Sequence, residues 1–587
     1  MQLLSTKLID SLNTGRRGIF FQYFVLFISL LLGIMFFGLF RIYGFVIFPD
    51  EFGYWSSAAA AIGTDWSQVA SLGSYYAFGY SFILTPILYI FGGGIAAYRT
   101  AIVINVLLQC SSIFFLKGIM KILYPKMPNI DAIYCIGIAV FYPVWSFYSQ
   151  MTLAESLIMF LFVLSVFLMA SLFERPTVLK AFFLILTLVY MYFVHMRLIG
   201  IVAGALIVLF IWALRNPKLR KFIIFIVILL AVGAAGALIL KKIVQGRVYA
   251  GTSQELLAGN DYSGQIYTIK YILTGEGFRA LIFGVLCKIF YLGVASLGTF
   301  YITCVYLFKQ ILVLKKRYRS EEGPRPKQFV CLFIFLCILF QFLITAAYMN
   351  SPNKLDSITY GRYNDYLIPI VLCLGTRQLM RCSYRLKYFL ITSIISGWLC
   401  AVTIAYSIYS KLQDMHEYFV AGISYFWDVY SFDPMKDYIK AFVAGTIIFG
   451  IVLISIHLSR KRGKWLLLLN VILTVEIALT LILCTKDVYS SGEIDRIDSG
   501  IATYIQNHKD EDATVYYVQS DGRCIIDVVQ FNLDDEIIQV IDGSGIDEKI
   551  LSGDYLIVDM RNNLSLEENS MYSLKKESVW FRLYKKK

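Results

Sequence analysis

Residues 49–55 read Pro-Asp-Glu-Phe-Gly-Tyr-Trp and come directly after the first long apolar segment, Gly18 to Phe40. That segment has no charged side chain and is long enough to cross a bilayer as a helix. Basic residues precede it, so the positive-inside rule predicts that its start is cytoplasmic and its end lies outside. Asp50 and Glu51 are therefore expected at the outer membrane face, where ionisable groups are costly and usually functional.

The composition is that of an integral membrane protein. Hydrophobic residues make up 58% of the 587 residues, charged residues 16%, and the mean hydropathy is +0.66. From Thr485 onward there are 12 Lys and Arg against 20 Asp and Glu, so this tail carries −8 and the remainder +21. The basic residues mark cytoplasmic loops and lipid headgroups, and give no case for nucleic-acid binding. The 11 cysteines form no CxxC pair and lie mostly in apolar segments, as small hydrophobic residues.

The hydropathy pattern predicts a polytopic α-helical membrane protein with about 13 transmembrane helices. The expected spans are 18–40, 98–120, 131–149, 152–173, 178–195, 198–214, 221–240, 281–311, 328–349, 366–380, 388–409, 438–458 and 465–484. Residues 42–97 form a long first outer loop. Within it, the apolar stretch from Ala77 to Gly94 is broken by Pro86 and by Gly92-Gly93-Gly94, which favours a helix lying in the interface over a crossing.

The loop charges support this assignment. With residues 77–94 counted as interfacial, every strongly basic short loop falls on the cytoplasmic side. We therefore expect a multi-pass protein of the cell membrane, with the N-terminus inside and the C-terminus outside. The expected domains are a transmembrane domain, 1–484, and a small extracytoplasmic α/β domain, 485–587. In the latter, a helix near Glu493–His508 precedes strands at 514–519, 537–541, 555–559 and 579–584.

Acidic residues at the outer ends of spans are the first candidates for chemistry. Asp50 and Glu51 are followed one turn later by Tyr54 and Trp55. An Asp at a helix start is often only an N-cap, but two carboxylates at the rim of a multi-span protein favour proton transfer from a substrate hydroxyl. Glu155 opens the fourth expected span from the same side, either as a charge that complements the helix dipole or as a pocket residue.

Basic residues at the outer ends are unexpected and form a second group. Arg99 starts the second expected span, and His195 and Arg197 lie between the fifth and sixth. Outer arginines can simply reach lipid headgroups. Several cations at one level also suit a phosphate, which guanidinium groups bind in bidentate fashion.

The run Thr359-Tyr360-Gly361-Arg362-Tyr363-Asn364-Asp365-Tyr366 ends an outer loop just before the tenth expected span. An aromatic belt explains the tyrosines, but not Arg362, which a tight turn would present to an anion or a sugar. The polar loop 241–280 is a candidate lid.

Taken in order, these features resemble the GT-C superfamily of membrane glycosyltransferases that use polyprenyl-phosphate sugars, and most closely the protein O-mannosyltransferases and lipid A aminoarabinose transferases. In that family a catalytic acid follows the first span, interfacial helices come next, and an Arg often starts the second span. Asp50-Glu51, the segment 77–94 and Arg99 occur in that order, and Glu155 matches a recurring acid at the fourth span. The resemblance covers roughly the first 215 residues.

The resemblance implies transfer of a monosaccharide from a polyprenyl phosphate to an acceptor hydroxyl at the outer face, with inversion. It implies Asp50 as general base, assisted or oriented by Glu51. The acceptor side would be lined by Glu155, Tyr54 and Tyr363. The donor phosphate would be held by Arg99, His195, Arg197 and Arg362. The implied partners are the lipid-linked sugar, membrane lipids, and a glycan, glycolipid or protein acceptor. The adjacent Asp-Glu departs from the spaced D-x-D of metal-dependent members, which puts a required divalent metal in doubt.

Three other functions remain open from the sequence. In a lipid or oligosaccharide flippase or transporter, the same charges would gate passage, although that class usually has ionisable groups or broken helices near the bilayer midplane. An O-antigen-type polymerase or ligase would depend more on loop arginines than on a first-loop acid. A catalytically inactive relative could use its tail to bind a partner.

Overall fold

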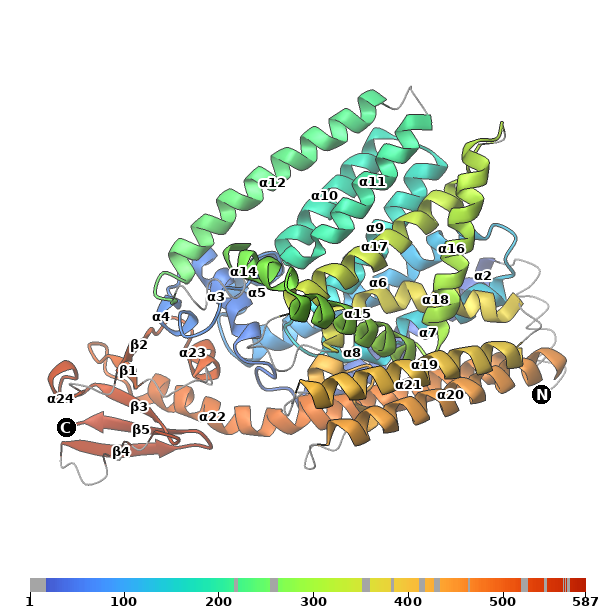
Figure 1. The fold of residues 1–587 in the computed structure, drawn as a ribbon. Coiled ribbons are helices and arrows are strands. Elements are labelled where there is room, and N and C mark those ends of the chain that lie inside the picture. Colours follow the sequence, from blue (N-terminus) through green and yellow to red (C-terminus); the bar gives the residue numbers. More distant parts are fainter. Residues whose placement is uncertain are drawn as a thin grey trace.

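The structure is a computed structural model of the chain. It describes residues 17–215, 220–253, 262–321, 323–350, 359–381, 385–410, 417–426, 433–462, 465–518, 526–542, 546–562, 564, 566 and 571–587. A large helical body carries a small domain with a sheet at one end (Figure 1). We call this end of the molecule the domain end, and the opposite end of the helical body the far end.

The helical body is built from long apolar helices and shorter connecting ones. They are α2 (Arg17–Leu39), α3 (Asp50–Ile62), α4 (Ser67–Ala70), α5 (Ser81–Phe91), α6 (Ile95–Leu123), α7 (Asn129–Val140), α8 (Pro143–Ser149), α9 (Glu155–Glu174), α10 (Val178–Val194), α11 (Ile199–Arg215), α12 (Arg220–Val248), α14 (Tyr262–Ile272), α15 (Gly275–Ala295), α16 (Thr299–Tyr318), α17 (Pro326–Tyr348), α18 (Ile368–Arg381), α19 (Arg385–Tyr409), α20 (Pro434–Arg462) and α21 (Trp465–Leu483).

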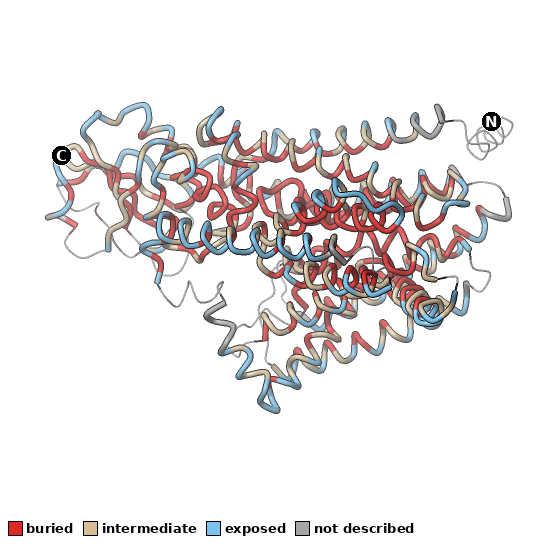
Figure 2. The backbone as a smooth tube through the Cα atoms, turned by 90° about the horizontal axis from the view of Figure 1, so that it is seen from above, coloured by how far each residue is buried: buried red, intermediate tan, exposed pale blue. Residues whose placement is uncertain are grey.

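The chain is a multi-pass membrane protein. Among the described residues, nine helices are long and apolar enough to cross a bilayer, or ten if the bent pair α7 and α8 is one span. Helix α9 lies deep in the body, whereas α12 presents exposed apolar side chains such as Ile228 and Val232. Figure 2 shows the same contrast, with buried backbone through the middle of the bundle and exposed backbone on peripheral helices. An apolar outer face of this kind suits contact with lipid.

The predicted number of about 13 spans is not confirmed, and one predicted span was wrong. The stretch 281–311 forms two helices, α15 and α16, separated at Ser296–Gly298. Leu297 and Gly298 both have positive φ (50° and 76°), which no helix interior accepts. The break falls at Ser296-Leu297-Gly298-Thr299, a short interruption of an otherwise apolar stretch that the prediction of one long span passed over.

The first loop folds into short helices at the domain end. Helix α3 begins at Asp50, directly after Pro49, and ends at Gly63 in the left-handed conformation. Helix α5 has 11 residues and ends at Gly92, with φ of 66°. A helix of that length spans about 16 Å, too short to cross a bilayer. That 77–94 lies in the membrane interface stays a prediction.

The C-terminal domain has a five-stranded sheet in the order β2-β1-β3-β5-β4, formed by β1 (Val515–Val518), β2 (Ile538–Ile541), β3 (Tyr555–Asp559), β4 (Tyr572–Glu577) and β5 (Phe581–Lys586). β1 pairs in parallel with β2 and β3, and β5 is antiparallel to β3 and β4. The predicted α/β tail is therefore confirmed. The sequence missed the edge strand β4, whose last three residues, Lys575, Lys576 and Glu577, are charged and exposed, and α23 (Asp527–Leu533).

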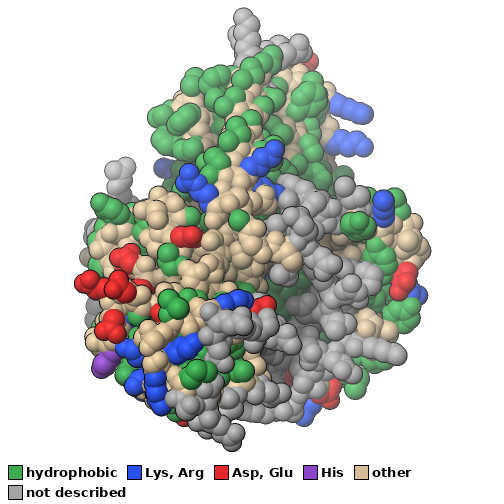
Figure 3. Space-filling model, turned by 90° about the vertical axis from the view of Figure 1, so that its left-hand side faces the viewer, with side chains coloured by type: hydrophobic (Ala, Val, Ile, Leu, Met, Phe, Trp, Pro, Cys, Tyr) green, Lys and Arg blue, Asp and Glu red, His purple; other side chains and the backbone are tan. Residues whose placement is uncertain are grey.

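Two connections fix this domain to the body. Helix α21 continues through a π-helical turn, Cys484–Val488, into α22 (Tyr489–His508), giving one helix of 42 residues from Leu467. The domain also packs on the first loop, where Trp66 Nε1 donates to the Asp534 carbonyl oxygen at 2.9 Å. The Phe531 ring lies against Trp55 and Phe45. In Figure 3, which faces the domain end, acidic side chains gather on one part of the surface and hydrophobic side chains cover the helices beyond it.

Candidate active site

Asp50 occupies the first position of α3 and is held by two partners from distant parts of the chain. Its Oδ1 accepts a hydrogen bond from the Tyr76 hydroxyl at 2.9 Å, and its Oδ2 lies 2.8 Å from NH1 of Arg362. The Asp50 side chain keeps 23% of its surface exposed, whereas Arg362 keeps only 3%. The carboxylate is thus fixed in orientation and still accessible to a substrate.

Behind Asp50, two arginines share one buried carboxylate. Arg362 Nε donates to Oε1 of Glu155 at 2.7 Å, and Arg197 NH2 donates to the same oxygen at 3.3 Å. Glu155 is 3% exposed, and its Oε2 has no hydrogen-bond partner among the described residues. Removing one partner of a buried ion pair costs about 3–5 kcal/mol, so Glu155 anchors both guanidinium groups.

Arg197 is positioned by its neighbours and has donors to spare. Its guanidinium lies 3.8 Å from the centre of the Tyr363 ring, and its backbone N–H donates to Nδ1 of His195. Its Nε and NH1 atoms are buried and have no partner within the described part of the chain. Unsatisfied buried donors of a charged group are costly, which indicates that a ligand with acceptor oxygens completes this site.

His195 is a neutral imidazole at ordinary pH. Burial, together with the charges of Arg197 and Arg362, lowers the pKa of His195 well below its usual value. Its ring stacks edge-on against Tyr363, with centroids 5.7 Å apart. It can therefore donate or accept a hydrogen bond, but adds no positive charge.

These groups surround a cavity of about 320 Å³ at the domain end of the body. It is formed by side chains from the first loop, the α10–α11 junction, α14, α17 and the loop before α18. The lining residues are Asp50, Tyr54, Tyr75, Tyr76, Ala77, His195, Met196, Arg197, Ile199, Thr268, Ile269, Ile344, Ala347, Tyr348, Arg362 and Tyr363. We call it the reaction cavity. Six of the predicted site residues line it, with Glu155 directly behind.

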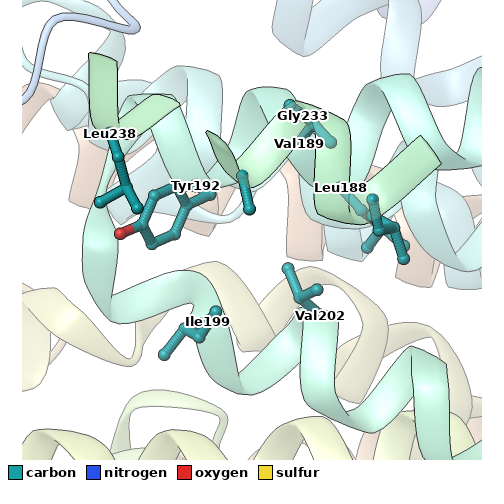
Figure 4. Close-up of a pocket in the computed structure, with 9 residues that line it drawn as sticks. Leu188, Val189, Tyr192, Ile199, Val202, Gly233 and Leu238 are labelled. Atoms are coloured by element: carbon teal, nitrogen blue, oxygen red, sulfur yellow. The ribbon is translucent and has the colours of Figure 1, made fainter. Parts of the chain in front are cut away.

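A narrow apolar pocket of about 160 Å³ adjoins the reaction cavity through Ile199, which lines both. It lies between α10, α11 and α12. In Figure 4, Ile199 and Val202 of α11 point toward Tyr192 and Leu188 of the facing helix. Gly233 on α12 leaves no room for a larger residue, because an added Cβ would lie 2.5 Å from Val189. This pocket offers no charge and suits a hydrocarbon chain.

Glu51 does not line the reaction cavity. Its side chain is fully buried, and its two oxygens accept five hydrogen bonds: from Val46 N, Ile47 N, Tyr98 Oη, Thr152 N and Thr152 Oγ1, at 2.6–3.0 Å. Burial raises the pKa of Glu51, and these hydrogen bonds act in the opposite direction. The structure therefore places Glu51 as a tie between the first loop and the start of α9, and not beside a substrate.

Arg99 also lies away from the reaction cavity. Its Nε and NH2 donate to the carbonyl oxygens of Ile42 and Phe40, and its guanidinium faces the rings of Phe40 and Tyr43. Arg99 thus satisfies carbonyls at and just beyond the end of α2. The structure does not bring this arginine to the phosphate site that the sequence predicted for it.

Sequence reasoning missed two polar residues, Tyr76 and Asp365, of which only Tyr76 lines the reaction cavity. Tyr76 lies in the expected first outer loop, directly before the segment 77–94, and was not distinguished from the other aromatic residues of that loop. Asp365 was part of the quoted run, and the structure buries it completely, with the hydroxyls of Tyr291, Tyr142 and Tyr148 donating to its oxygens at 2.7, 3.2 and 3.4 Å. Burial raises the pKa of Asp365 to about 7. The sequence offered one signal for Asp365, namely an acidic residue three positions after Arg362.

Two further sequence expectations are resolved only in part. Residues 254–261 of the candidate lid 241–280 lie outside the described residues, and the described remainder contains the end of α12, helix α14 and the start of α15. Within the described ranges, no group of three or more His, Cys, Asp or Glu side chains is arranged to hold a metal.

Comparison of the whole chain with known proteins gives the fold. No protein-family model and no curated protein matches the sequence. Among solved structures, ArnT from Cupriavidus metallidurans bound to undecaprenyl phosphate matches with a TM-score of 0.54 at 13% identity, over 95% of this chain and 97% of that chain. The same protein in the apo state matches with a TM-score of 0.50 at 15% identity, over the same shares. The chain therefore shares the fold of ArnT, in agreement with the fold that the resemblance in the sequence implied.

Proposed function

We propose that this protein transfers a monosaccharide from a polyprenyl phosphate to an acceptor hydroxyl in the reaction cavity. The observation that carries the proposal is the convergence of an accessible carboxylate, Asp50, with the buried guanidinium groups of Arg197 and Arg362 in one cavity. A base and a phosphate site at such short range are the two groups that this displacement requires.

In the proposed reaction, Asp50 accepts the proton of the acceptor hydroxyl. The hydroxyl oxygen attacks the anomeric carbon from the face opposite the phosphate. The bond between that carbon and the phosphate oxygen breaks, and its electron pair leaves with the phosphate, so the configuration inverts. Arg197 supplies the two unpartnered donors that would stabilise the growing negative charge.

The lining of the reaction cavity also suits both parts of a lipid-linked donor, the polyprenyl chain and the sugar. Ile269, Ile344 and Ala347 provide apolar walls, and Ile199 leads into the pocket between α10, α11 and α12. We place the polyprenyl chain along this route. The fold match with ArnT bound to undecaprenyl phosphate supports a polyprenyl-phosphate lipid as the partner. Tyr54, Tyr76 and Tyr363 would face the sugar and the acceptor, because aromatic rings and hydroxyls suit carbohydrate.

The orientation follows from the loop charges. Since basic loops mark the cytoplasmic side, the domain end would face outward, and the reaction would take place at the outer surface of the cell membrane.

Mass spectrometry of copurifying lipids tests this function. Wild type is compared with Arg197→Gln, which removes the two free donors, and with Arg99→Gln, which removes an arginine at the same end but outside the cavity. We expect polyprenyl phosphate, or its glycosylated form, with wild type and Arg99→Gln and its depletion in Arg197→Gln. Polyprenyl diphosphate-linked oligosaccharide would instead indicate a polymerase or ligase. Bulk phospholipid alone in all three samples would contradict the proposal.

A further inference from the structure

A second polar cavity, of about 570 Å³, lies at the far end of the body. It is formed where α6, α9 and α18 end and where α17 begins. Glu155, at the other end of the 20-residue helix α9, holds the arginines of the reaction cavity, so the two cavities are about 30 Å apart along that helix. The lining residues are Ile122, Leu123, Tyr124, Pro125, Lys126, Met127, Glu174, Arg325, Pro326, Lys327, Arg377 and Arg381. We call it the far-end cavity.

The far-end cavity carries an excess of positive charge. Five of its lining residues are Lys or Arg, and Glu174 is its one acid. Arg377 forms an ion pair with Asp131, so Asp131 compensates one of the five positive charges in addition to Glu174. Lys327 lies 4.4 Å and Arg377 5.7 Å from the centre of the same Tyr124 ring, so two cations of the cavity lining lie within about 10 Å of each other. Like charges held at this range are stabilised by an anion between them.

Arg377 has a donor left for such an anion. The residue is 6% exposed, and its buried Nε has no hydrogen-bond partner among the described residues. A buried guanidinium donor without an acceptor is unfavourable. A phosphate oxygen would satisfy it, because guanidinium groups bind phosphate through paired donors.

Basic residues at this end could simply follow the positive-inside rule, facing headgroups from loops. The far-end cavity differs in two respects. Its cations come from three separate segments and converge on one concave site, and its central arginine is buried. Ile122, Leu123 and Met127 add an apolar wall beside the cations.

We propose that the far-end cavity binds a phosphate group, supplied either by the headgroup of an anionic lipid or by free phosphate. Arg377 and Lys327 form the floor of the site. Lys126 and Arg381, which are exposed, contact the ligand at its mouth. This site is separate from the reaction cavity and does not depend on the transferase activity.

Binding to the purified full-length protein in detergent tests the proposal, with dioctanoyl phosphatidic acid, dioctanoyl phosphatidylcholine and inorganic phosphate as probes. The cavity variant is Lys126→Gln with Arg381→Gln. The matched control is Lys315→Gln with Lys316→Gln, which removes two exposed charges at the end of α16, outside the cavity. Unfolding temperatures of both variants confirm that they fold.

We expect phosphatidic acid to bind wild type and the control alike, and at least about tenfold more weakly to the cavity variant. Tighter binding of phosphatidic acid than of inorganic phosphate identifies a lipid headgroup as the ligand. Equal binding of the two, lost in the cavity variant, identifies free phosphate. Equal losses in cavity variant and control, equal binding of phosphatidylcholine, or no binding of either anion would overturn the proposal.

Discussion

Asp50 and Arg362, which are 312 positions apart in the chain, meet at 2.8 Å between Oδ2 and NH1. The first loop and the loop before α18 are thereby joined at the point where the cavity is most polar. Because Arg362 also donates to Glu155, the contact sets the direction of the Asp50 carboxylate relative to both arginines.

Replacing Asp50 by Asn should abolish most of the transfer activity. Asn still accepts the Tyr76 hydrogen bond but cannot take a proton from the acceptor, so we expect a loss on the order of 10²–10⁴ in rate. Sugar transfer by purified protein supplied with the donor measures it. Asp65→Asn, an exposed acid in the same loop, is the control and should retain normal turnover. Normal turnover by Asp50→Asn would refute the assignment of the base.

Replacing the neighbouring Glu51 by Gln should have a different effect. The amide turns one of the two acceptor atoms into a donor facing other donors, so we expect a loss of about 1–3 kcal/mol in unfolding free energy. Thermal unfolding in detergent should show a lower midpoint for Glu51→Gln than for wild type and Asp50→Asn. The rate per folded Glu51→Gln molecule should stay within a few-fold of wild type. An unchanged unfolding midpoint together with lost transfer activity would indicate that Glu51 takes part in catalysis.

Replacing Gly53 by Ala should impair the site through Tyr76. An added Cβ would lie 2.2 Å from Cδ2 of Tyr76, so the ring must move, and its hydroxyl would leave Asp50. Alanine otherwise favours a helix over glycine by about 1 kcal/mol, so the expected result is reduced transfer without loss of helix stability. Gly33→Ala, with nothing within 4 Å of the added atom, is the control. Full activity in Gly53→Ala would show that the Tyr76 contact is dispensable.

The burial of Asp365 predicts a pH dependence of stability. Its pKa is raised from 3.8 to about 7 in the folded protein, so the folded state binds the proton more tightly. Tighter binding of this proton adds to the free energy of unfolding. The contribution is fully present below pH 3.8 and is lost as the pH rises to about 7. Between pH 5 and 8, the unfolding temperature of wild type should therefore fall relative to that of Asp365→Asn. If the unfolding temperatures of the two proteins changed with pH in parallel, the raised pKa of Asp365 would be contradicted.

The outline of the fold was predictable because it depends on hydropathy and charge. Apolar length predicted most of the long helices, and Pro86 with the glycines after it predicted that the stretch around α5 does not cross. The break at Leu297–Gly298 was missed because hydropathy averaged over a span hides a short Ser-Leu-Gly-Thr interruption and does not report the two positive φ angles. The edge strand β4 was missed because its outer residues are charged, as edge strands often are.

The candidate site was predictable as a set of charges but not as a geometry. Residue type and position along each span identified Asp50, Arg197 and Arg362, which the structure brings to one cavity. Residue type and position alone did not distinguish Asp50 from Glu51, and only the family resemblance implied Asp50 as the base and Glu51 as its assistant. Consecutive helix positions differ in direction by about 100°, so Asp50 faces the cavity while Glu51 faces Tyr98 and Thr152. Arg99 was selected for its position at a helix start, where it binds carbonyls instead.

The helix that runs without interruption from Leu467 to His508 restricts how this protein can evolve. Each residue added to or removed from it would turn the C-terminal domain by about 100° and move it by 1.5 Å. Either change would separate Phe531 from Trp55 and Asp534 from Trp66, which hold the first loop in place. Substitutions along this helix can accumulate, but its length is coupled to the position of a loop more than 400 residues earlier.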